Sequence, residues 1–375
     1  MARVLFLMRY ALAGDSLRAK FDGQLSAVGR LGHEAHVIAW GDGGLWLMGP
    51  KQKRLLTRCP LERMPGYAQT VFYVDLMRAL QRALALERFD LVYLRFMPVF
   101  FNAPRALARA CAQGAKLVVE HPTYPFENGR VTSLARMPVF AYNRRVFRRI
   151  EPLIDLYALI GEPCGGRLNG RPAINITNGV DVDALALHAP RPEKDVGMLA
   201  LASMSRWQGY DRLLDALARY RGNVPVTVHL VGGEGDGALA EWRRMSESLG
   251  LNAVFHGELH GKALDAAAAM CDIGVGGLGL YRKGQMESRT LKLREYMARG
   301  LPFVYAVDDP DVPDNPRFCL RVPNDDSPLN LEAMVAFALA AKADAQAPAL
   351  MRAYAREHMS WDAVMRRVLD EVGLK

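Results

Sequence analysis

Short apolar runs alternate with segments of helical periodicity along most of the chain. Residues 3–8 form an apolar run, and apolar side chains then recur through residues 17–31 at the spacing of one helix face. Gly32 ends this predicted helix, and residues 33–40 supply the next strand. The pattern predicts further helices near 71–86, 104–112 and 133–150. Buried strands that alternate with long helices are typical of a doubly wound parallel sheet.

A second alternation of the same kind follows a segment with no sustained apolar face. Because a chain of 375 residues is longer than an ordinary domain with a single core, we predict two α/β domains. The first spans 1–180 and the second 194–357, with a linker at 181–193. A last helix, at about 358–375, is expected to pack back on the first domain. Ligands of such sheets bind beyond the carboxyl ends of the strands, so we expect the chemistry there, in a shared cleft.

Composition supports a globular protein and adds an uneven charge. Half of the residues are apolar and 23% are charged, which excludes disordered and fibrous classes. Residues 1–175 hold 25 Lys and Arg against 13 Asp and Glu, whereas the remainder holds 23 against 27. A basic N-terminal half indicates a polyanionic partner: nucleic acid, an anionic membrane or a phosphorylated substrate.

The sequence offers no pattern typical of a metal site or a disulfide framework. The five cysteines are far apart and lack CxxC spacing. No HxxxH pair on a helix is found, and the acidic cluster VDDPD at 307–311 is predicted to be a loop because of Pro310, so we expect no metal cofactor. The apolar run before Arg9 is too short for a signal peptide, and no stretch approaches a bilayer span. We therefore expect a cytoplasmic protein.

Two carboxylates flank a predicted junction between a loop and a helix. Glu287 and Glu295 stand eight positions apart, and Ser288 and Thr290 can cap the helix. The first backbone N–H groups, at 289–291, would bind an anion. The carboxylates could accept hydrogen bonds from a sugar and a ribose on either side of a diphosphate. The alternative is a solvated helix start whose acids interact with the helix dipole.

This segment resembles the Glu-(seven residues)-Glu motif of the retaining family four of glycosyltransferases. NGVD at 178–181, SRWQGYDRLLDAL at 205–217 and EHMSWDAV at 357–364 resemble further phrases of that family, in the same order. LGLYRKG at 278–284 and EHPTYPFENGR at 120–130 look like its capsule and exopolysaccharide branches. The resemblance covers essentially the whole chain.

The resemblance implies an α/β fold of the GT-B kind, in which two Rossmann-like, doubly wound domains face a central cleft. It also implies metal-independent, retaining transfer of a hexosyl-type sugar in bacterial surface polysaccharide biosynthesis. The donor would be a nucleotide diphosphate sugar, and the acceptor would be a glycan or a lipid-linked molecule.

The resemblance further implies roles for individual residues. The predicted catalytic residues are His121, Arg206 and Glu287. The predicted donor-binding residues are Gly14, Gln208, Lys283, Ser288, Arg289, Thr290, Leu291 and Glu295. Lys20 and Gln24 are the predicted acceptor contacts. A guanidinium suits Arg206 because its fixed fork binds phosphate oxygens in pairs. The alternatives are a surface arginine beside Trp207 and, for His121, a packed core histidine.

The sequence departs from the family pattern at Gln208, where the family normally carries a lysine. We expect Lys283, Arg282 or Arg289 to supply the missing charge. The first loop is also weak as a phosphate-binding loop, because Gly14 stands alone where the family has two glycines, and one glycine commonly just turns the chain.

The pattern of residues 136–154 predicts a basic amphipathic helix. Arg144, Arg145, Arg148 and Arg149 lie on one side, and Phe140, Phe147, Ile150 and Ile154 on another. Such a helix can lie on anionic lipid, with about 1 kcal/mol gained for each basic residue near the surface. The alternative is a solvated face over an ordinary core. No nucleic-acid motif accompanies the charge.

Three other functions fit parts of this pattern. A nucleotide-sugar 2-epimerase shares the architecture and needs no acceptor. A non-catalytic nucleotide-sugar-binding protein would explain Gln208 and the weak first loop. A basic nucleic-acid-binding protein is the least favoured. The favoured prediction is a cytoplasmic glycosyltransferase that associates peripherally with the inner face of the cell membrane.

Overall fold

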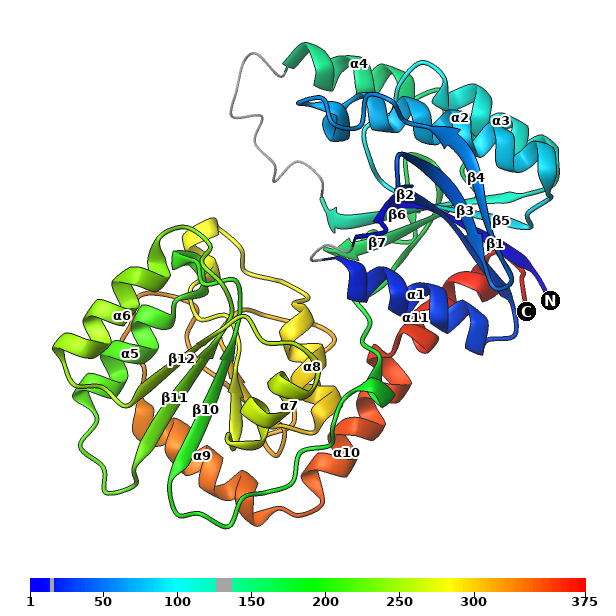
Figure 1. The fold of residues 1–375 in the computed structure, drawn as a ribbon. Coiled ribbons are helices and arrows are strands. Elements are labelled where there is room, and N and C mark those ends of the chain that lie inside the picture. The colour runs from blue at the N-terminus through cyan, green and yellow to red at the C-terminus, as the bar shows by residue number, and fades with distance from the viewer. Residues whose placement is uncertain (14–16, 126–136) are drawn as a thin grey trace. The chain divides into compact units, whose positions relative to one another are not determined.

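The computed structural model describes residues 1–13, 17–125 and 137–375, which form two compact units (Figure 1). The first unit consists of Met1–Gly179 and Trp361–Lys375, and the second is Val180–Ser360. In each unit, helices cover both faces of one β-sheet. The chain therefore leaves the first unit once and returns to it for its last fifteen residues.

The first unit is built on a nine-stranded sheet with the order β4-β3-β2-β1-β5-β6-β7-β9-β8. Its strands are β1 (Arg3–Ala11), β2 (Glu34–Gly41), β3 (Gly44–Gly49), β4 (Gln52–Arg58), β5 (Leu91–Arg95), β6 (Lys116–Tyr124), β7 (Leu156–Gly161), β8 (Arg167–Leu168) and β9 (Arg171–Asn175). The central strands pair in parallel, as the periodicity predicted. Both outer edges carry antiparallel pairs.

One edge of this sheet departs from the predicted all-parallel arrangement. Residues 44–58 form the antiparallel strands β3 and β4. A two-residue loop, Asp42 and Gly43, joins β2 to β3, with φ angles of 51° and 73°. Left-handed φ values at both positions are those of a type I′ hairpin turn, which Asp-Gly favours. The Asp-Gly dipeptide is the sequence signal for this hairpin, and the alternation of strands and helices does not reveal it.

Helices pack on both faces of the first sheet. They are α1 (Arg18–Arg30), α2 (Val71–Leu86), α3 (Ala103–Ala112), α4 (Met137–Phe147) and α11 (Trp361–Glu371). Helices α2, α3 and α4 lie on one face, and α1 and α11 lie on the other (Figure 1). Five central strands thus lie between two apolar layers, which fixes the positions of the loops at their ends.

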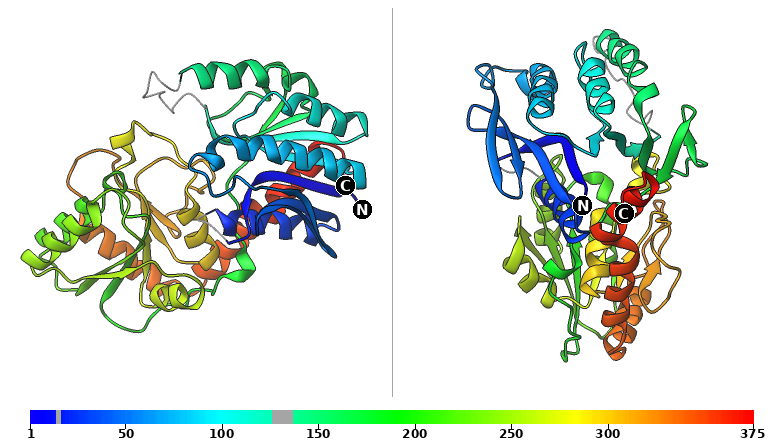
Figure 2. Two further views of the ribbon diagram at one scale, coloured as in Figure 1. Left: turned by 45° about the horizontal axis from the view of Figure 1, so that its top comes forward. Right: turned by 90° about the vertical axis from the view of Figure 1, so that its right-hand side faces the viewer.

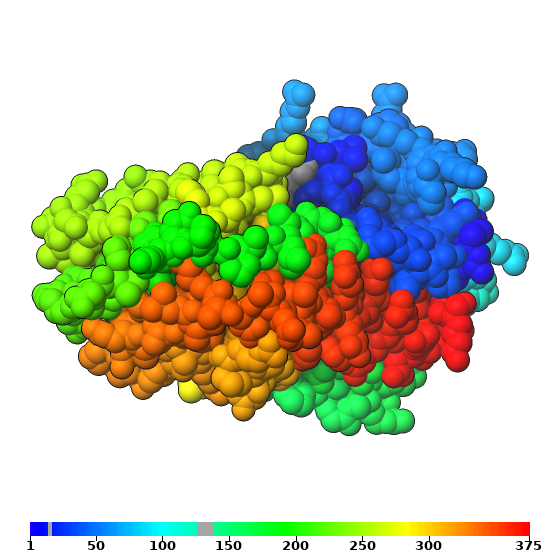
Figure 3. Space-filling model, turned by 90° about the horizontal axis from the view of Figure 1, so that it is seen from below, coloured from blue at the N-terminus to red at the C-terminus, as the bar shows by residue number. Residues whose placement is uncertain are grey.

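The C-terminal helix packs on the first unit through Trp361. A Cβ added to Gly23 would lie 2.2 Å from Trp361 Cδ1, and one added to Gly179 would lie 2.4 Å from Cδ2. Both positions therefore need glycine. The ion pair between Arg30 and Asp362, at 2.6 Å, adds a contact between α1 and α11. Figure 3 shows the C-terminal residues, in red, against the blue N-terminal residues.

The second unit is built on a six-stranded parallel sheet with the order β12-β11-β10-β13-β14-β15. Its strands are β10 (Val196–Leu201), β11 (Val226–Val231), β12 (Ala253–Gly257), β13 (Ile273–Val275), β14 (Phe303–Tyr305) and β15 (Cys319–Arg321). Its helices are α5 (Tyr210–Arg219), α6 (Ala238–Ser248), α7 (Gly261–Ala269), α8 (Leu291–Arg299), α9 (Leu331–Ala343) and α10 (Ala347–Tyr354). Helices α5, α6 and α9 cover one face, and α7, α8 and α10 cover the other (Figure 2).

The segment predicted as a linker, residues 181–193, packs entirely on the second unit. Val182 is buried in its core. The backbone N–H of His188 donates to the carbonyl of Arg299 at 2.7 Å, and Arg191 pairs with Asp272 at 2.9 Å. These contacts tie the segment to α8 and to the start of β13.

The helices and cysteines of the described residues add two findings. None of these helices is both long enough and apolar enough to cross a membrane. All five cysteines are free thiols, and Cys59 and Cys271 are buried.

Candidate functional site

In the second unit, two loops that follow adjacent strands are held together by glycine contacts. The loops follow β10 and β13, which pair in parallel. The N–H of Leu278 donates to the carbonyl of Gln208 at 2.8 Å. A Cβ added to Gly209 would lie 2.5 Å from the nitrogen of Gly279, and Gly209 has a φ of +72°. Gly209 therefore allows the two backbones to touch at the carboxyl edge of the sheet.

A glycine-rich third loop, residues 232–237, follows β11 and joins this edge. Met204 exchanges backbone hydrogen bonds with it, donating to Gly233 at 2.8 Å and accepting from Gly235 at 3.0 Å. The N–H of Arg206 donates to both carboxylate oxygens of Asp236 at 3.1 Å. The sequence predictions did not include this loop. Its GGEGDG composition directly after a strand was the available signal.

Helix α8 begins at the same edge without a side-chain cap. Thr290 occupies the N-cap position, but its buried hydroxyl makes no hydrogen bond, and the predicted capping bond is absent. Ser288 does not cap the helix either. It lies in an extended segment, and its own backbone N–H donates to the carbonyl of Asp308 at 2.8 Å. Leu291, the first helical residue, is exposed. The first N–H groups of α8 are thus left for water or for a bound anion.

The two carboxylates around this helix start are both paired with arginines. Glu287 lies 2.6 Å from Arg289, whose buried guanidinium also contacts Asp311 at 3.1 Å. Glu295 lies 2.9 Å from Arg299, one turn further along α8. Arg289 therefore holds Glu287 in place. Arg289 is one of the three cations expected to compensate for Gln208, but its charge is already balanced by Glu287 and Asp311.

The other predicted cations are on the surface of the same loops. The side chain of Arg206 is 59% exposed and lies 2.5 Å from Glu241 on α6. Arg282 donates to both carboxylate oxygens of Asp211 at 2.8 Å. The ammonium of Lys283, which is exposed, lies 3.6 Å from the centre of the Trp207 ring.

Lys292, which no sequence argument selected, contacts Gln208. Its Nζ donates to Gln208 Oε1 at 2.6 Å and to the hydroxyl of Tyr210 at 3.0 Å. Burial lowers the pKa of Lys292 to about 7. The sequence signal that could have selected Lys292 is its place in the first turn of a predicted helix, where the helix dipole disfavours a positive charge.

The predicted residues of the first unit that the structure describes lie around the middle of β6, which continues past His121 to Tyr124. Glu120 is fully buried and accepts hydrogen bonds from Lys20 at 2.8 Å, Gln24 at 2.7 Å and Tyr93 at 2.8 Å. Burial alone would raise the pKa of Glu120, but Lys20 and Arg95 outweigh it and lower the pKa to about 2. The polar ends of Lys20 and Gln24 thus face Glu120 inside the unit. Their predicted role as acceptor contacts stays a prediction.

His121 lies next to this network, at 6% exposure. Its ring stacks on Phe96, with 4.3 Å between ring centres, and meets the edge of Phe147. Burial lowers the pKa of His121 to about 4, so the imidazole is neutral at physiological pH. His121 belongs to the first unit, whereas Arg206 and Glu287 belong to the second. Gly14 lies outside the described residues.

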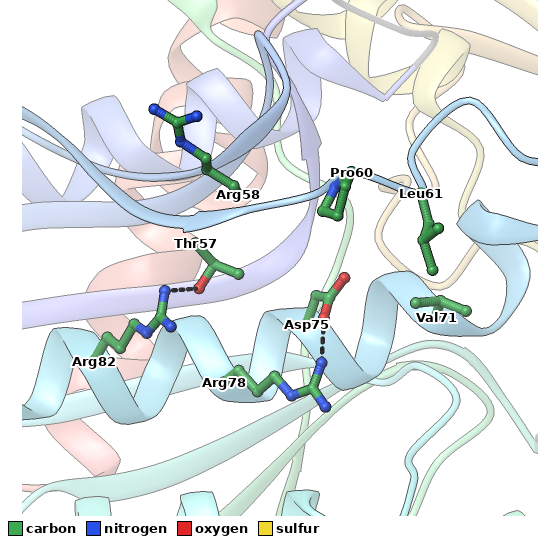
Figure 4. Close-up of a pocket in the computed structure, with 8 residues that line it drawn as sticks. All are labelled: Thr57, Arg58, Pro60, Leu61, Val71, Asp75, Arg78 and Arg82. Atoms are coloured by element: carbon green, nitrogen blue, oxygen red, sulfur yellow. Dashed lines mark hydrogen bonds and ion pairs between the residues drawn. The ribbon is translucent and has the colours of Figure 1, made fainter.

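A cavity of about 590 Å³ lies in the first unit between the end of β4 and helix α2 (Figure 4). Its lining includes Arg58, Arg78 and Arg82 beside the buried carboxylate of Asp75. Arg78 pairs with Asp75 at 2.9 Å, and Arg82 donates to the hydroxyl of Thr57 at 3.2 Å. None of the predicted site residues lines this cavity. Its excess of guanidinium groups suits an anionic ligand.

The predicted basic helix ends earlier than expected, because α4 stops at Phe147 and Arg148, Arg149 and Ile150 follow it in a turn. Arg144, Arg145, Arg148 and Arg149 are all exposed. Val146 and Ile150 enter the core, but Phe140, predicted on the apolar face, is 46% exposed. Val139 and Tyr142 are exposed as well.

Within residues 1–13, 17–125 and 137–375, no group of three or more His, Cys, Asp or Glu side chains is placed to hold a metal ion. The expectation of metal-independent chemistry stays a prediction.

Comparisons with known proteins place the chain by its fold. No protein-family model and no curated protein sequence match it. Among solved structures, Anabaena Alr3699/HepE in complex with UDP matches over 99% of both chains, with 17% identity and a TM-score of 0.60. The fold is GT-B. A glycosyltransferase from Rickettsia africae matches over 98% of this chain and 97% of its own, with 13% identity and a TM-score of 0.63.

A third GT-B structure is the catalytic domain of starch synthase IV from Arabidopsis thaliana, bound to ADP and acarbose. It matches over 99% of this chain and 98% of its own, with 11% identity and a TM-score of 0.64. The predicted fold class is therefore confirmed. At these identities the likeness concerns the fold alone.

Proposed function

We propose that this protein is a retaining glycosyltransferase that uses a nucleotide diphosphate sugar. The observation that carries the proposal is the start of α8, which has no side-chain cap and is flanked by Glu287 and Glu295. It adjoins three glycine-containing loops at the carboxyl edge of a parallel sheet, where such sheets bind ligands. Two of the GT-B structures named above hold UDP or ADP, which supports a nucleoside diphosphate as the leaving group.

In this proposal the helix start and Arg206 stabilise the diphosphate as it leaves. The bond from the anomeric carbon to the diphosphate oxygen breaks, and the acceptor oxygen bonds to that carbon on the same face. The hydroxyl proton passes to the departing diphosphate. Glu287, held by Arg289, orients the donor sugar, and Glu295 binds the ribose. Stabilisation of the leaving charge supplies most of the rate gain, so no covalent carboxylate is needed.

The neutral imidazole of His121 would contact the donor sugar in the same proposal. Its low pKa makes it a hydrogen-bond partner that carries no charge at neutral pH. Glu120 is already satisfied by Lys20, Gln24 and Tyr93, which favours a structural role for this carboxylate.

For the acceptor, we propose a glycan or a lipid-linked molecule of bacterial surface polysaccharide biosynthesis, and the cytoplasm as the location of the enzyme. Arg144, Arg145, Arg148 and Arg149, together with the exposed apolar side chains of α4, would bind the anionic inner face of the membrane. This surface supports a membrane-associated acceptor.

A panel of nucleoside diphosphates and their sugars, tested by thermal unfolding of the full chain, examines the donor. A ligand at 100 times its dissociation constant adds about 2.7 kcal/mol of stability. We expect one base to stabilise the protein and its sugar conjugate to be consumed when an acceptor is present. Stabilisation by no nucleotide would refute the proposal. Conversion of the donor sugar without an acceptor would favour a 2-epimerase, and binding without turnover would favour a non-catalytic binding protein.

A further inference from the structure

Lys292 lies at the point of the second unit where a bound diphosphate would be expected. Its ammonium donates to the hydroxyl of Tyr210 at 3.0 Å. That hydroxyl lies 3.3 Å from the carbonyl oxygens of both Leu201 and Val275 and shares its single proton between them. These are the last residues of β10 and β13, the two central strands of the sheet. The ammonium therefore lies at the carboxyl edge of these strands, beside the start of α8.

The charge of Lys292 has no counter-ion within the part of the chain that the structure describes. Its polar partners are two neutral oxygens, those of Gln208 and Tyr210. Both of these residues are buried, and Lys292 itself is partly buried. A cation in such a place is costly unless an anion compensates it. It also lies in the first turn of α8, where the helix dipole opposes positive charge.

The other cations of the site contrast with Lys292. Arg206, Arg282 and Arg289 each lie within 3 Å of a carboxylate oxygen, on Glu241, Asp211 and Glu287 respectively. Lys283 lacks such a pair but is exposed to water and lies over the Trp207 ring. Lys292 is thus the basic group of this site whose charge the described residues leave uncompensated.

We propose that Lys292 binds the diphosphate of the donor and supplies the positive charge that Gln208 lacks. This inference rests on the proposed function. The helix start and the ammonium together offer backbone N–H groups and one full charge, the combination that binds phosphate groups tightly. Gln208 keeps a separate role, because its side-chain oxygen orients the ammonium at 2.6 Å.

Calorimetric titration with the nucleoside diphosphate identified by the panel, and with the uncharged nucleoside of the same base, tests this inference. We expect Lys292→Met to weaken binding of the diphosphate by about tenfold to a hundredfold and to leave binding of the nucleoside unchanged. Lys262, an exposed lysine in the first turn of α7, is the matched control, and we expect Lys262→Met to change the affinity by less than about threefold. A further Gln208→Lys substitution in Lys292→Met should restore much of the lost affinity.

Equal affinity of wild type and folded Lys292→Met for the diphosphate would overturn the inference and leave the proposed function standing. Failure of the wild type to bind any nucleoside diphosphate would instead refute the proposed function. If Lys292→Met does not fold, Lys292→Arg provides the reading, since a guanidinium retains the charge. Its affinity for the diphosphate should stay within about threefold of wild type, and a loss as large as that expected for Lys292→Met would count against the inference.

Discussion

Lys20 and Glu120 form a buried ion pair, with 2.8 Å between Nζ and Oε1, across 100 residues of sequence. The side chains are 4% and 1% exposed. The pair links helix α1 to the middle of β6, and Gln24 and Tyr93 donate further hydrogen bonds to the carboxylate. A carboxylate so fully satisfied stays ionised despite its burial.

The first prediction concerns the stability that depends on this pair. Glu120→Gln removes the negative charge and leaves the Lys20 ammonium buried without compensation, which typically costs 3–5 kcal/mol. We expect a loss of about that size in the free energy of unfolding of the first unit, measured by urea denaturation. Asp362→Asn, which breaks the exposed pair with Arg30, should cost less than about 1 kcal/mol. Equal losses in the two variants would contradict the prediction.

The second prediction concerns turnover. Glu287→Ala and Arg206→Ala should each lower kcat by at least about a hundredfold, because they remove contacts to the sugar and to the leaving diphosphate. The side chain of Arg206 is exposed, and Arg289 keeps its contact with Asp311 when Glu287 is removed, so the unfolding temperature should change little. The measurement is initial-rate transfer with the donor from the nucleotide panel.

Matched variants exist for both substitutions. Glu332, in the first turn of α9, is the control for Glu287, and Arg219, paired with Asp215 on α5, is the control for Arg206. Replacement of either control residue by alanine should leave kcat within about threefold of wild type. Wild-type kcat in Glu287→Ala would remove that residue from the site.

The third prediction concerns pH. The pKa of Lys292 in the free protein is about 7, so the ammonium loses its proton as the pH rises above that value. A bound diphosphate favours the charged form, so donor binding takes up a proton at higher pH. Affinity should therefore be greatest below about pH 7 and then fall by up to tenfold for each pH unit. Lys292→Arg, with its permanent charge, should bind with a flatter profile.

The nucleotide sugar is the suitable probe, since its diphosphate is esterified at both ends and keeps its charge over this range. Neighbouring elements also carry the pairs Arg206 with Glu241, Arg282 with Asp211 and Arg289 with Glu287, and the exposed Lys283. Burial raises the pKa of Tyr210, which therefore stays neutral. Identical profiles for wild type and Lys292→Arg would assign the pH dependence to another group.

The fourth prediction concerns the basic helix. Replacement of Arg144 and Arg145 by alanine should weaken binding to phosphatidylserine vesicles by about 2 kcal/mol, or roughly thirtyfold, at low salt. Co-sedimentation measures this binding, with phosphatidylcholine vesicles as the neutral reference. Arg366 and Arg367, exposed on α11 across the sheet, form the matched control pair. An equal loss in both double variants would indicate nonspecific attraction.

The sequence predicted the order of strands and helices well because buried strands and amphipathic helices leave strong periodic signals. It also predicted that residues 287–295 span a loop and a helix start. The antiparallel strands at 44–58 were missed, since their signal lies in one Asp-Gly turn and not in periodicity.

The side-chain contacts were harder to predict because they depend on residues far apart in sequence. Lys20 and Gln24 were selected as acceptor contacts, but their partner, Glu120, lies about 100 residues away. The importance of Lys292 depends on a contact with Gln208, 84 positions earlier. Periodicity and local motifs carry no information on such pairs.

The chain passes into the second unit at Val180 and leaves it after Ser360, and this affects the order in which the two units can fold during synthesis. These two residues pair as a short bridge, and everything between them forms one continuous unit. That unit can mature once residue 360 has left the ribosome. The first unit lacks Trp361 and the rest of α11 until these later residues have been synthesised, so its apolar face around Gly23 and Gly179 stays open meanwhile. The earlier half of the gene thus encodes the part of the protein that is finished last.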